Sequence, residues 1–388
     1  MPTTRAIVLG AGMVGSVMAA DLAFDPAFDV TVADLRPANL AAAKDRAGGK
    51  LKTVQADLSN AAEVKKLVAN YDLVLGAIAS SIGLQTLRAV IEAGKNYCDI
   101  TFMAEDAIDL DDLAKKHNVT AVVDCGVAPG MSHMISGAEA SAMDSCENIE
   151  IYVGGLPRER RWPFQYKAPF SPGDVIEEYT RPSRLVEHGK VVIREALSEP
   201  ELMNFPGVGT LEAFNTDGLR SLARTFNVPF MKEKTLRYPG HIELMRVLRA
   251  TGLFSTEPVD VNGVKVAPRD LLAKLMFPLW TFQPGEEDVT VMRIIVDGTK
   301  NNRRTRVTWD LHDTYHQPSR ATSMSRTTAF PCTIMARLVA SGEFRQKGVV
   351  VPELIGKAPG ILTKVIDQHR SKGVNYTRSE TPLDGSLA

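Results

Sequence analysis

Apolar residues in the first third of the chain occur in short runs, and amphipathic stretches separate these runs. The runs expected to form strands are Ala6–Leu9, Val30–Ala33, Leu51–Val54, Leu73–Gly76, Asn96–Asp99 and Thr120–Val123. The stretches expected to form helices are Val14–Phe24, Ala38–Arg46, Ala61–Val68, Leu84–Ala93 and Ala107–Lys116. Strands that alternate with helices predict a parallel sheet with helices on both faces. We therefore expect residues 1–125 to form an α/β domain of the doubly wound, Rossmann type.

The pattern changes after residue 125. Further strands are expected at 149–153, 185–192, 235–238, 289–296 and 304–309, and helices at 172–179, 241–250 and 269–274. The run Val291-Met-Arg-Ile-Ile-Val296 mixes polar and apolar positions, which favours a mostly antiparallel sheet with one covered face. Residues 126–325 are thus expected to form a second α/β domain. Ala329–Ser341 predicts a long helix, whereas residues 376–388 lack apolar anchors and are expected to be disordered.

Composition narrows the class of protein. The 388 residues suffice for two domains, and a formal net charge of −1 gives no case for a nucleic-acid partner. No run of 18 apolar residues and no secretory signal pattern occurs, so we expect a cytoplasmic protein without a membrane partner. The four cysteines show no zinc spacing, which predicts reduced thiols and no metal site.

A glycine-rich loop follows the first predicted strand and carries the strongest functional signal. It reads Gly10-Ala-Gly12-Met-Val-Gly15, and Asp34 ends the next strand. In this motif the first glycine makes a tight turn, the second lets a pyrophosphate approach the backbone, and the third lets helix and strand pack closely. Met13 and Val14 open the helix whose positive end receives the phosphates. Asp34 can bind the ribose hydroxyls and would repel a 2′-phosphate, which favours NAD, although Arg36 leaves NADP as the alternative.

Further cofactor contacts are expected where the parallel strands end, because ligands of such sheets bind beyond the carboxyl ends of the strands. Small residues after the fourth strand would let the backbone approach the cofactor, and the residues after the third strand would flank the adenine. The predicted contacts beyond the glycine loop are Asp34, Leu35, Arg36, Asp57, Leu58, Ala77, Ile78, Ala79, Asp99 and Thr101.

Substrate chemistry is expected at the domain junction and in two polar clusters of the second domain. The junction reads Asp124-Cys-Gly-Val-Ala-Pro-Gly130, and the clusters are Asn215–Arg220 and Thr235–His241. Arg220 or Arg237 can hold a substrate carboxylate with two parallel hydrogen bonds. The predicted substrate contacts are Thr216, Arg220, Arg237, Pro129 and Gly130. The candidates for a general base are Asp124, Asp217 and His241, and the sequence does not rank them.

Several segments together resemble the saccharopine dehydrogenase (glutamate-forming) family, and its bacterial lysine 6-dehydrogenase branch in particular. They are Gly126–Met131, Tyr152–Pro157, Leu211–Phe214, Thr235–His241 and Ala321–Arg326. The resemblance implies a Rossmann domain completed by about residues 325–365 and a central domain for substrate binding and dimerisation. Members that oxidise saccharopine usually carry an aspartate just before the Pro-Gly of the turn. Here Ala128 holds that position, as in the lysine-oxidising branch.

The reaction implied by this resemblance is oxidation of the C–N bond of an amino-acid amine, with hydride transfer to NAD and an imine as product. Two alternatives within the family are a saccharopine dehydrogenase and a polyamine-type synthase that uses NAD transiently. A sugar or polyol oxidoreductase is a third alternative, but those families usually show Glu-Lys-Pro after the fifth strand, where this chain reads Asn96-Tyr-Cys-Asp-Ile-Thr101. The resemblance, and the sheet face or edge that the central domain would leave open, predict a homodimer.

Overall fold

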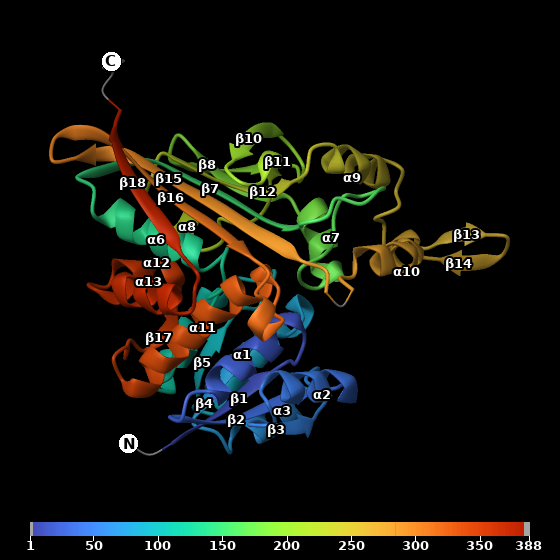
Figure 1. The fold of residues 1–388 in the computed structure, drawn as a ribbon, viewed down its shortest axis with the longest axis vertical. Coiled ribbons are helices and arrows are strands. Elements are labelled where there is room, and N and C mark those ends of the chain that lie inside the picture. The colour runs from blue at the N-terminus through green and yellow to red at the C-terminus, as the bar shows by residue number, and fades with distance from the viewer. Residues whose placement is uncertain (1–2, 284, 384–388) are drawn as a thin grey trace. The chain divides into compact units, whose positions relative to one another are not determined.

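The computed structural model describes residues 3–283 and 285–383 of the chain (Figure 1). The chain divides into two compact units. Unit 1 comprises Met1–Ala142, Arg224–Phe226 and Gln317–Tyr376, and unit 2 comprises Met143–Ala223, Asn227–His316 and Thr377–Ala388. Among the helices of the described residues, none combines the length and apolar character that crossing a bilayer requires.

Unit 1 is built on a parallel sheet, which the described residues form from seven strands in the order β17-β6-β5-β4-β1-β2-β3. The strands are β1 (Thr4–Leu9), β2 (Phe28–Asp34), β3 (Lys52–Gln55), β4 (Leu73–Gly76), β5 (Asn96–Asp99), β6 (Thr120–Val122) and β17 (Gly348–Val350). Strand order reverses between β1 and β4, so the first strand lies at the point where a doubly wound sheet binds its ligand. The predicted Rossmann-type fold is confirmed.

Helices cover both faces of this sheet. Those of unit 1 are α1 (Met13–Ala23), α2 (Pro37–Arg46), α3 (Ala61–Val68), α4 (Gly83–Glu92), α5 (Asp111–Lys116), α6 (Met131–Ser141), α11 (Ser323–Ser341), α12 (Pro352–Lys357) and α13 (Ile361–Ser371), with short 3-10 turns η1 (Ser80–Ile82), η2 (Ala107–Leu110) and η3 (Gln317–Ser319). Helix α1 contacts α2 and α11, whereas α4 contacts α3 and α5. The core between strands and helices is aliphatic and includes Ile7, Val74, Leu87 and Val90, all fully buried.

Unit 2 contains a mixed sheet, which has nine strands in the described residues. The strands are β7 (Ser145–Pro157), β8 (Ser183–Glu187), β9 (Lys190–Arg194), β10 (Glu201–Phe205), β11 (Gly209–Asn215), β12 (Phe230–Arg237), β15 (Asp288–Lys300), β16 (Arg303–Thr314) and β18 (Tyr376–Pro382). Strand β12 runs parallel to β7, while β7, β15 and β16 form antiparallel pairs. The prediction of a mostly antiparallel sheet is confirmed.

Helices α7 (Pro172–Thr180), α9 (His241–Ala250) and α10 (Pro268–Trp280) share a core in unit 2. Trp280 is fully buried there, with the rings of Phe164 and Tyr166 standing edge-on against it. The short helix α8 (Leu222–Thr225) and the hairpin of β13 (Val259–Val261) and β14 (Val264–Val266) complete the described elements.

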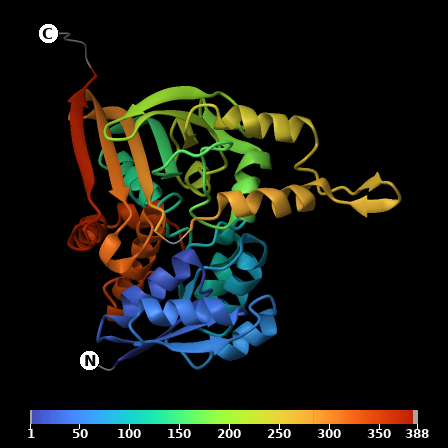
Figure 2. The ribbon, with the colours of Figure 1, turned by 45° about the vertical axis from the view of Figure 1, so that its right-hand side comes forward.

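Two expectations for these elements were wrong, and two strands were missed. The single strand expected at 185–192 is a hairpin, because His188 and Gly189 take positive φ angles of 50° and 73° and turn the chain between β8 and β9. Strands β10 and β11 were not expected. The tail expected to be disordered forms β18 over Tyr376–Pro382, beside β16 (red beside orange in Figure 2), and residues 384–388 lie outside the described part of the chain.

Candidate functional site

The glycine loop of unit 1 has two glycines that the protein itself requires and one that faces open space. A side chain on Gly10, whose φ is +96°, would place its Cβ 2.2 Å from the carbonyl oxygen of Ala77, and one on Gly15 would lie 2.1 Å from that of Gly10. A Cβ on Gly12 would meet no atom within 4 Å. The packing of the protein therefore explains Gly10 and Gly15, whereas Gly12 keeps space clear for a ligand.

Helix α1 begins at Met13 directly after this space. Its N-cap residue, Gly12, provides no side-chain hydrogen bond, and the first turn carries no acidic residue. The first backbone N–H groups of a helix have no partner within the helix, and the helix dipole makes this end positive. Met13 is exposed and Val14 is buried beneath it. This geometry fits the pyrophosphate of a dinucleotide.

Asp34 ties the end of β2 to the glycine loop. Its Oδ2 accepts hydrogen bonds from the backbone N–H of Ala11 at 2.8 Å and from the amide of Asn39 at 3.1 Å. Its Oδ1 accepts the N–H of Arg36 at 2.8 Å, and the guanidinium of Arg36, 74% exposed, lies 4.0 Å away. Leu35 between them is exposed. The negative charge of Asp34 is therefore held beside the glycine loop by hydrogen bonds, and the exposed positive charge of Arg36 lies next to it.

The chain after β4 runs beneath the same loop. The N–H of Ala77 donates to the carbonyl of Leu9 at 2.8 Å, which brings residues 77–79 against the glycine turn. Ile78 is half-buried and Ala79 is exposed. After β3, Asp57 is exposed and accepts two hydrogen bonds from Ser59, while Leu58 is buried. Asp57 thus shapes a turn in this structure.

The ends of β5 and β6 bring two buried carboxyl groups near one another. Asp99 is fully buried, and its Oδ1 accepts hydrogen bonds from the N–H and the hydroxyl of Thr101 at 2.9 and 2.6 Å. Burial raises the pKa of Asp99 to about 7, and the charge of Asp124 adds to this effect while Thr101 opposes it. Gly76 is required here, because its Cβ would lie 2.4 Å from Oδ1 of Asp99. The carboxyl of Asp99 can therefore gain or lose a proton near neutral pH.

The turn after β6 is closely defined by its backbone. The φ of Asp124 is +50° and that of Gly130 is +138°, and a Cβ on Gly130 would lie 1.9 Å from the carbonyl oxygen of Gly126. The N–H of Gly126 donates to the carbonyl of Pro129 at 3.1 Å. Ala128 and Pro129 are half-exposed, whereas their neighbours in the turn are buried. This turn presents Ala128 and Pro129 at the surface of unit 1.

In unit 2, Arg237 is engaged in a buried network rather than held ready for a ligand. It is 2% exposed, and its Nη2 donates to Glu178 at 2.8 Å and to the Tyr166 hydroxyl at 3.3 Å. Its Nε donates to the Tyr179 hydroxyl at 3.1 Å, and its Nη1 donates to a backbone carbonyl at 3.0 Å. All three guanidinium nitrogens are therefore used, which disagrees with the expectation that Arg237 binds a substrate carboxylate.

His241 belongs to the same network. Its Nδ1 lies 2.9 Å from the carbonyl of Phe164 and its Nε2 lies 2.9 Å from the Tyr179 hydroxyl. Because Tyr179 accepts from Arg237, the consistent assignment has Nδ1–H donating to Phe164 and the Tyr179 hydroxyl donating to Nε2. Burial, together with the nearby charge of Arg237, lowers the pKa of His241 to about 3. His241 is thus a neutral, fully bonded ring, which makes it a poor candidate for the general base.

The other cluster of unit 2 contains a buried acid that sequence reasoning missed. Thr216 donates to Oε2 of Glu233 at 2.6 Å, and a Cβ on Gly218 would lie 2.3 Å from this carboxyl group. Burial raises the pKa of Glu233 to about 8, against the hydrogen bond from Thr216. Asp217 receives two hydrogen bonds of 2.8 Å from Arg184, so its carboxylate is already paired. Arg220 is buried with a φ of +48°.

The described residues also form a cavity, which lies away from the predicted site. A hollow of about 530 Å³ lies between α3 and α4, and none of the predicted site residues lines it. Within the described ranges, no three His, Cys, Asp or Glu side chains are placed to hold a metal ion.

Comparisons with known proteins agree with this geometry. Residues 6–122 match the saccharopine dehydrogenase NADP binding domain, and residues 126–374 match the saccharopine dehydrogenase C-terminal domain. The chain belongs to the saccharopine dehydrogenase family. It is accordingly an NAD(P)-dependent oxidoreductase of the kind that acts on C–N bonds.

Relatives within and near the saccharopine dehydrogenase family are distant in sequence. A saccharopine dehydrogenase [NADP(+), L-glutamate-forming] of Schizosaccharomyces pombe is 23% identical over 78% of this chain and 83% of its own length. A carboxyaminopropylagmatine dehydrogenase of Synechocystis is 23% identical over 89% of this chain and 91% of its own length. The chain spans about half (48%) of the bovine mitochondrial alpha-aminoadipic semialdehyde synthase that it matches. The apo saccharopine dehydrogenase (L-Glu forming) of Saccharomyces cerevisiae has the same fold, with a TM-score of 0.78 and 17% identity over 97% of this chain and 100% of that one.

The family bears on the choice of cofactor, and the structure shows which site residues the sequence did not reveal. The matched domain and the Schizosaccharomyces pombe relative are described with NADP, so these comparisons support a nicotinamide cofactor and favour NADP over the predicted NAD. Sequence reasoning found the glycine loop because its spacing is local. Glu233 carried no such signal, because Phe230-Met-Lys-Glu-Lys234 reads as an ordinary polar strand.

Proposed function

We propose that this protein oxidises the C–N bond of an amino-acid amine with NAD as the hydride acceptor, in the manner of a lysine 6-dehydrogenase. The observation that carries the proposal is the placement of Asp34. Its carboxylate is fixed to the glycine loop by the N–H of Ala11, at the position where a ribose is expected. A 2′-phosphate there would meet this negative charge, although Arg36 offers partial compensation.

Ala128 supports a primary amine as the substrate. It is half-exposed in the turn before Pro129 and Gly130, and saccharopine-oxidising relatives usually have an aspartate in its place. A methyl group cannot bind a second cationic or hydrogen-bonding part of a larger substrate. We therefore propose a substrate smaller than saccharopine.

The chemistry requires a neutral amine, since the nitrogen lone pair drives loss of hydride from the neighbouring carbon. Removing the proton of a lysine-type amine at pH 7 costs roughly 4–5 kcal/mol at 1.36 kcal/mol per pKa unit. Bound NAD supplies the hydride acceptor. Of the three candidate bases, Asp217 is paired with Arg184, and His241 is neutral with both ring nitrogens hydrogen-bonded. We assign the role to Asp124 because it follows β6, at the edge where ligands of a parallel sheet bind.

Arg220 is the proposed partner of the substrate carboxylate. Arg237 is engaged by Glu178, Tyr166 and Tyr179. Arg220 lies buried in the loop after β11, and its planar guanidinium can bind a carboxylate with two parallel hydrogen bonds. A charge-assisted hydrogen bond contributes about 1.5–3 kcal/mol. Arg220→Ala should then lower kcat/KM by roughly ten- to a hundredfold or more, while NAD affinity stays unchanged. Thr216, whose hydroxyl holds Glu233, would keep the loop of Arg220 in place.

The experiment that tests the function measures NADH and NADPH formation with lysine, saccharopine, ornithine and polyamines. Steady NADH formation with lysine or ornithine is the expected result. Preference for saccharopine would support the second candidate, a glutamate-forming dehydrogenase of secondary amines, which the similarity to the saccharopine dehydrogenases of the two yeasts favours. Turnover of polyamines without net NADH would indicate a synthase that uses NAD transiently.

We further propose that the protein is a homodimer and that unit 2 forms the contact. The resemblance to the saccharopine dehydrogenase family supports this, and so does the apolar surface that unit 2 exposes. Sedimentation velocity over micromolar concentrations tests it. A monomer at every concentration would exclude the dimer.

A further inference from the structure

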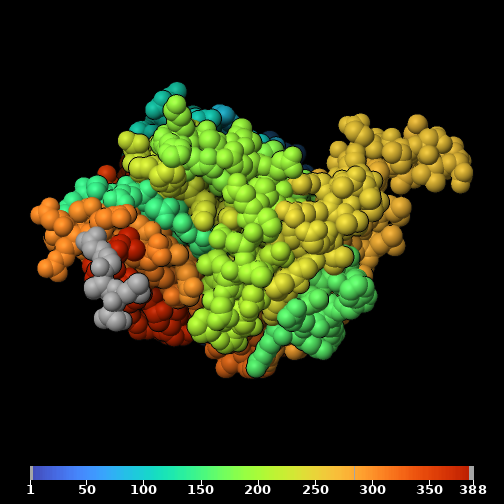
Figure 3. Space-filling view, turned by 90° about the horizontal axis from the view of Figure 1, so that it is seen from above, coloured from blue at the N-terminus to red at the C-terminus, as the bar shows by residue number. Residues whose placement is uncertain are grey.

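An arm of unit 2 carries apolar side chains that nothing in the described chain covers. We propose that this arm, residues 259–280, binds the same arm of a second copy of the chain. The arm consists of the β13–β14 hairpin followed by α10, and the hairpin stands clear of the rest of unit 2 in Figures 1 and 3 (gold). The inference rests on the proposed dimer and identifies the surface that forms it.

The hairpin has one apolar face and one charged face. Its register pairs Val259 with Val266 and Val261 with Val264, and because side chains alternate along a strand, all four valines lie on the same face. Asp260 and its cross-strand partner lie on the other face. Val259, Val261 and Val264 are exposed, Val264 to 61%. Charged residues thus face water on one side, while the valine face has no cover.

Helix α10 continues this apolar surface. Leu271, Leu275 and Leu279 follow one another at intervals of four, which places them along one strip of the helix. All three are exposed, Leu275 to 64%. A second side of the helix, about 100° around from this strip, is buried in the core of unit 2 through Met276 and Trp280. The helix is therefore apolar on two sides, and only one of them is used within the described chain.

Such an arm needs a partner. A hairpin of two strands is marginally stable in water unless a further strand or helix packs on it. Strands β13 and β14 pair only with each other within the described residues, so both edges of the hairpin are open. Exposed apolar side chains gathered on consecutive elements in this way are typical of an interaction site.

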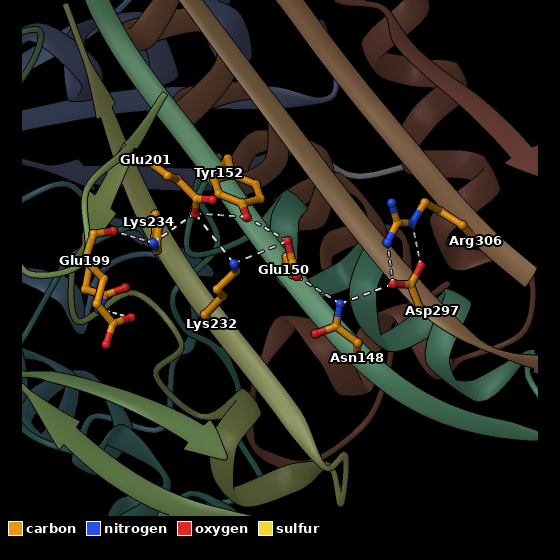
Figure 4. Close-up of polar contacts among 10 residues, drawn as sticks. Asn148, Glu150, Tyr152, Glu199, Glu201, Lys232, Lys234, Asp297 and Arg306 are labelled. Atoms are coloured by element: carbon orange, nitrogen blue, oxygen red, sulfur yellow. Dashed lines mark hydrogen bonds and ion pairs between the residues drawn. The ribbon is translucent and has the colours of Figure 1, made fainter. Parts of the chain in front are cut away.

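The large sheet of unit 2 offers a different surface, but its charges already have partners. On one face, Arg306 makes two hydrogen bonds of 2.8 Å to Asp297 (Figure 4). On the same face, Lys234 lies 2.8 Å from Glu201, and the Tyr152 hydroxyl donates to Glu150 at 2.6 Å. Because these groups satisfy one another, this face can remain in contact with water. The exposed apolar side chains of the arm therefore gain more from contact with a partner than this polar face does.

Charge indicates a second copy as the occupant. The arm, residues 259–280, contains two acidic side chains (Asp260 and Asp270) and three basic ones (Lys265, Arg269 and Lys274), so its formal net charge is only +1. A two-fold contact brings a patch against itself, which a strongly charged patch would oppose. The arm satisfies this condition and lacks the charge excess that would select an acidic or basic partner. Two valine faces packed on each other would form a small sandwich.

The first test is sedimentation of the double variant Val261→Asp, Leu275→Asp. We expect its dimer dissociation constant to rise at least a hundredfold, with far-UV circular dichroism and NAD binding unchanged. The matched control is Ile193→Asp on β9, an equally exposed apolar residue of unit 2 outside the arm, which should leave the dimer intact.

The possible outcomes distinguish the proposal that the arm forms the contact from the proposal that the protein is a dimer. A wild-type monomer would overturn both proposals. A dimer that survives the double variant, or that the Ile193→Asp control abolishes, would overturn the arm and leave the dimer standing.

A second test does not depend on the folding of the aspartate variants. Val261→Cys is oxidised in a Cys146→Ser background, since Cys98, Cys125 and Cys332 are buried. We expect a covalent dimer on a non-reducing gel, formed at least tenfold faster than with Asp260→Cys on the opposite face of the hairpin. Equal rates for the two variants would exclude contact between the valine faces.

Discussion

At the scale of single residues, Asp34 has both a structural and a proposed functional role. It holds the N–H of Ala11 in the glycine loop and the N–H of Arg36 after β2. It also supplies the negative charge that is expected to select NAD over NADP. A change that removes the charge and keeps one of these hydrogen bonds can separate the two roles.

Asp34→Asn is that change, since its amide oxygen can still accept one of the backbone N–H groups. We expect NAD affinity to fall by roughly ten- to a hundredfold, the loss of a hydrogen bond to a charged group. NADP should bind better, because the repulsion of its 2′-phosphate disappears. Titration calorimetry with both cofactors measures this. If the wild-type protein already prefers NADP, the role given to Asp34 is wrong and Arg36 becomes the determinant.

Glu233 predicts a particular dependence of stability on pH. Its pKa in the folded protein is about 8, above the ordinary value of 4.5, because it is buried against Gly218. Between these two values the folded protein keeps a proton that the unfolded chain has released. The free energy of unfolding therefore falls as pH rises from about 4.5 to about 8. Asp99, with a pKa of about 7, contributes a slope of the same sign.

Glu233→Gln should reduce this slope, since glutamine can still accept the hydrogen bond from Thr216 and does not titrate. Thermal melting between pH 5 and pH 8 measures the effect, with the exposed Glu257→Gln as control. An unchanged slope in Glu233→Gln would show that Glu233 is ionised throughout this range.

At the scale of elements, the glycine loop predicts two different outcomes for two glycines. Gly12→Val should leave the fold intact and abolish NAD binding, because its side chain enters space that the protein leaves clear. Gly10→Ala should lower the melting temperature, because its Cβ would meet the carbonyl of Ala77 in a backbone conformation with positive φ. Calorimetry and thermal melting on both variants test this. Retained NAD affinity in Gly12→Val would falsify the ligand role of the loop.

Removing strand β18 from the end of the chain is expected to lower the stability of the protein. A stop after Asn375 deletes the strand beside β16, including the ion pair of Lys300 with Glu380 at 2.9 Å. Loss of about 1–2 kcal/mol would lower the melting temperature by roughly 2–8 °C, and the freed edge of β16 should promote aggregation. A stop after Leu383 is the matched control and should change neither property. Equal stability of the two truncations would mean that β18 contributes nothing.

The sequence predicted the first domain better than the second, for a physical reason. Strands of a parallel sheet are buried on both faces, so β1 and β4 contain the continuous apolar runs Ala6–Leu9 and Leu73–Leu75. Strands β10 and β18 are mostly exposed or half-exposed and carry polar residues, and neighbouring strands hold them in place. Such strands form because of tertiary contacts, which the local pattern of apolar and polar residues does not reveal.

The same distinction applies to the candidate site. The glycine loop and Asp34 were predictable because their roles follow from local spacing. Arg237 and His241 looked available in the sequence, but they are buried by Tyr166, Tyr179 and other aromatic residues far away in the chain. Packing against distant residues decides which polar side chains face a ligand and which face one another.

At the scale of the whole molecule, cofactor binding should stabilise one part of the chain first. A ligand at a hundred times its dissociation constant stabilises the unit that binds it by about 2.7 kcal/mol. Amides of β1, β2 and β4 that exchange through unfolding of unit 1 should then exchange roughly a hundredfold more slowly. Hydrogen exchange with and without NAD measures this. Protection confined to residues 143–223 would place the cofactor in unit 2.

Strand β17 has a consequence for the newly made chain. It forms the edge of the parallel sheet by pairing with β6, yet 226 positions separate Val122 from Gly348. At a synthesis rate of about 5–20 residues per second, the ribosome needs roughly 11–45 s to make the intervening segment. During that time the edge of β6 lacks its neighbour, and most of unit 2 has already left the ribosome. The nucleotide-binding unit, although its first six strands are made early, is therefore completed only after most of unit 2, and nascent chains halted before residue 348 should bind the cofactor poorly.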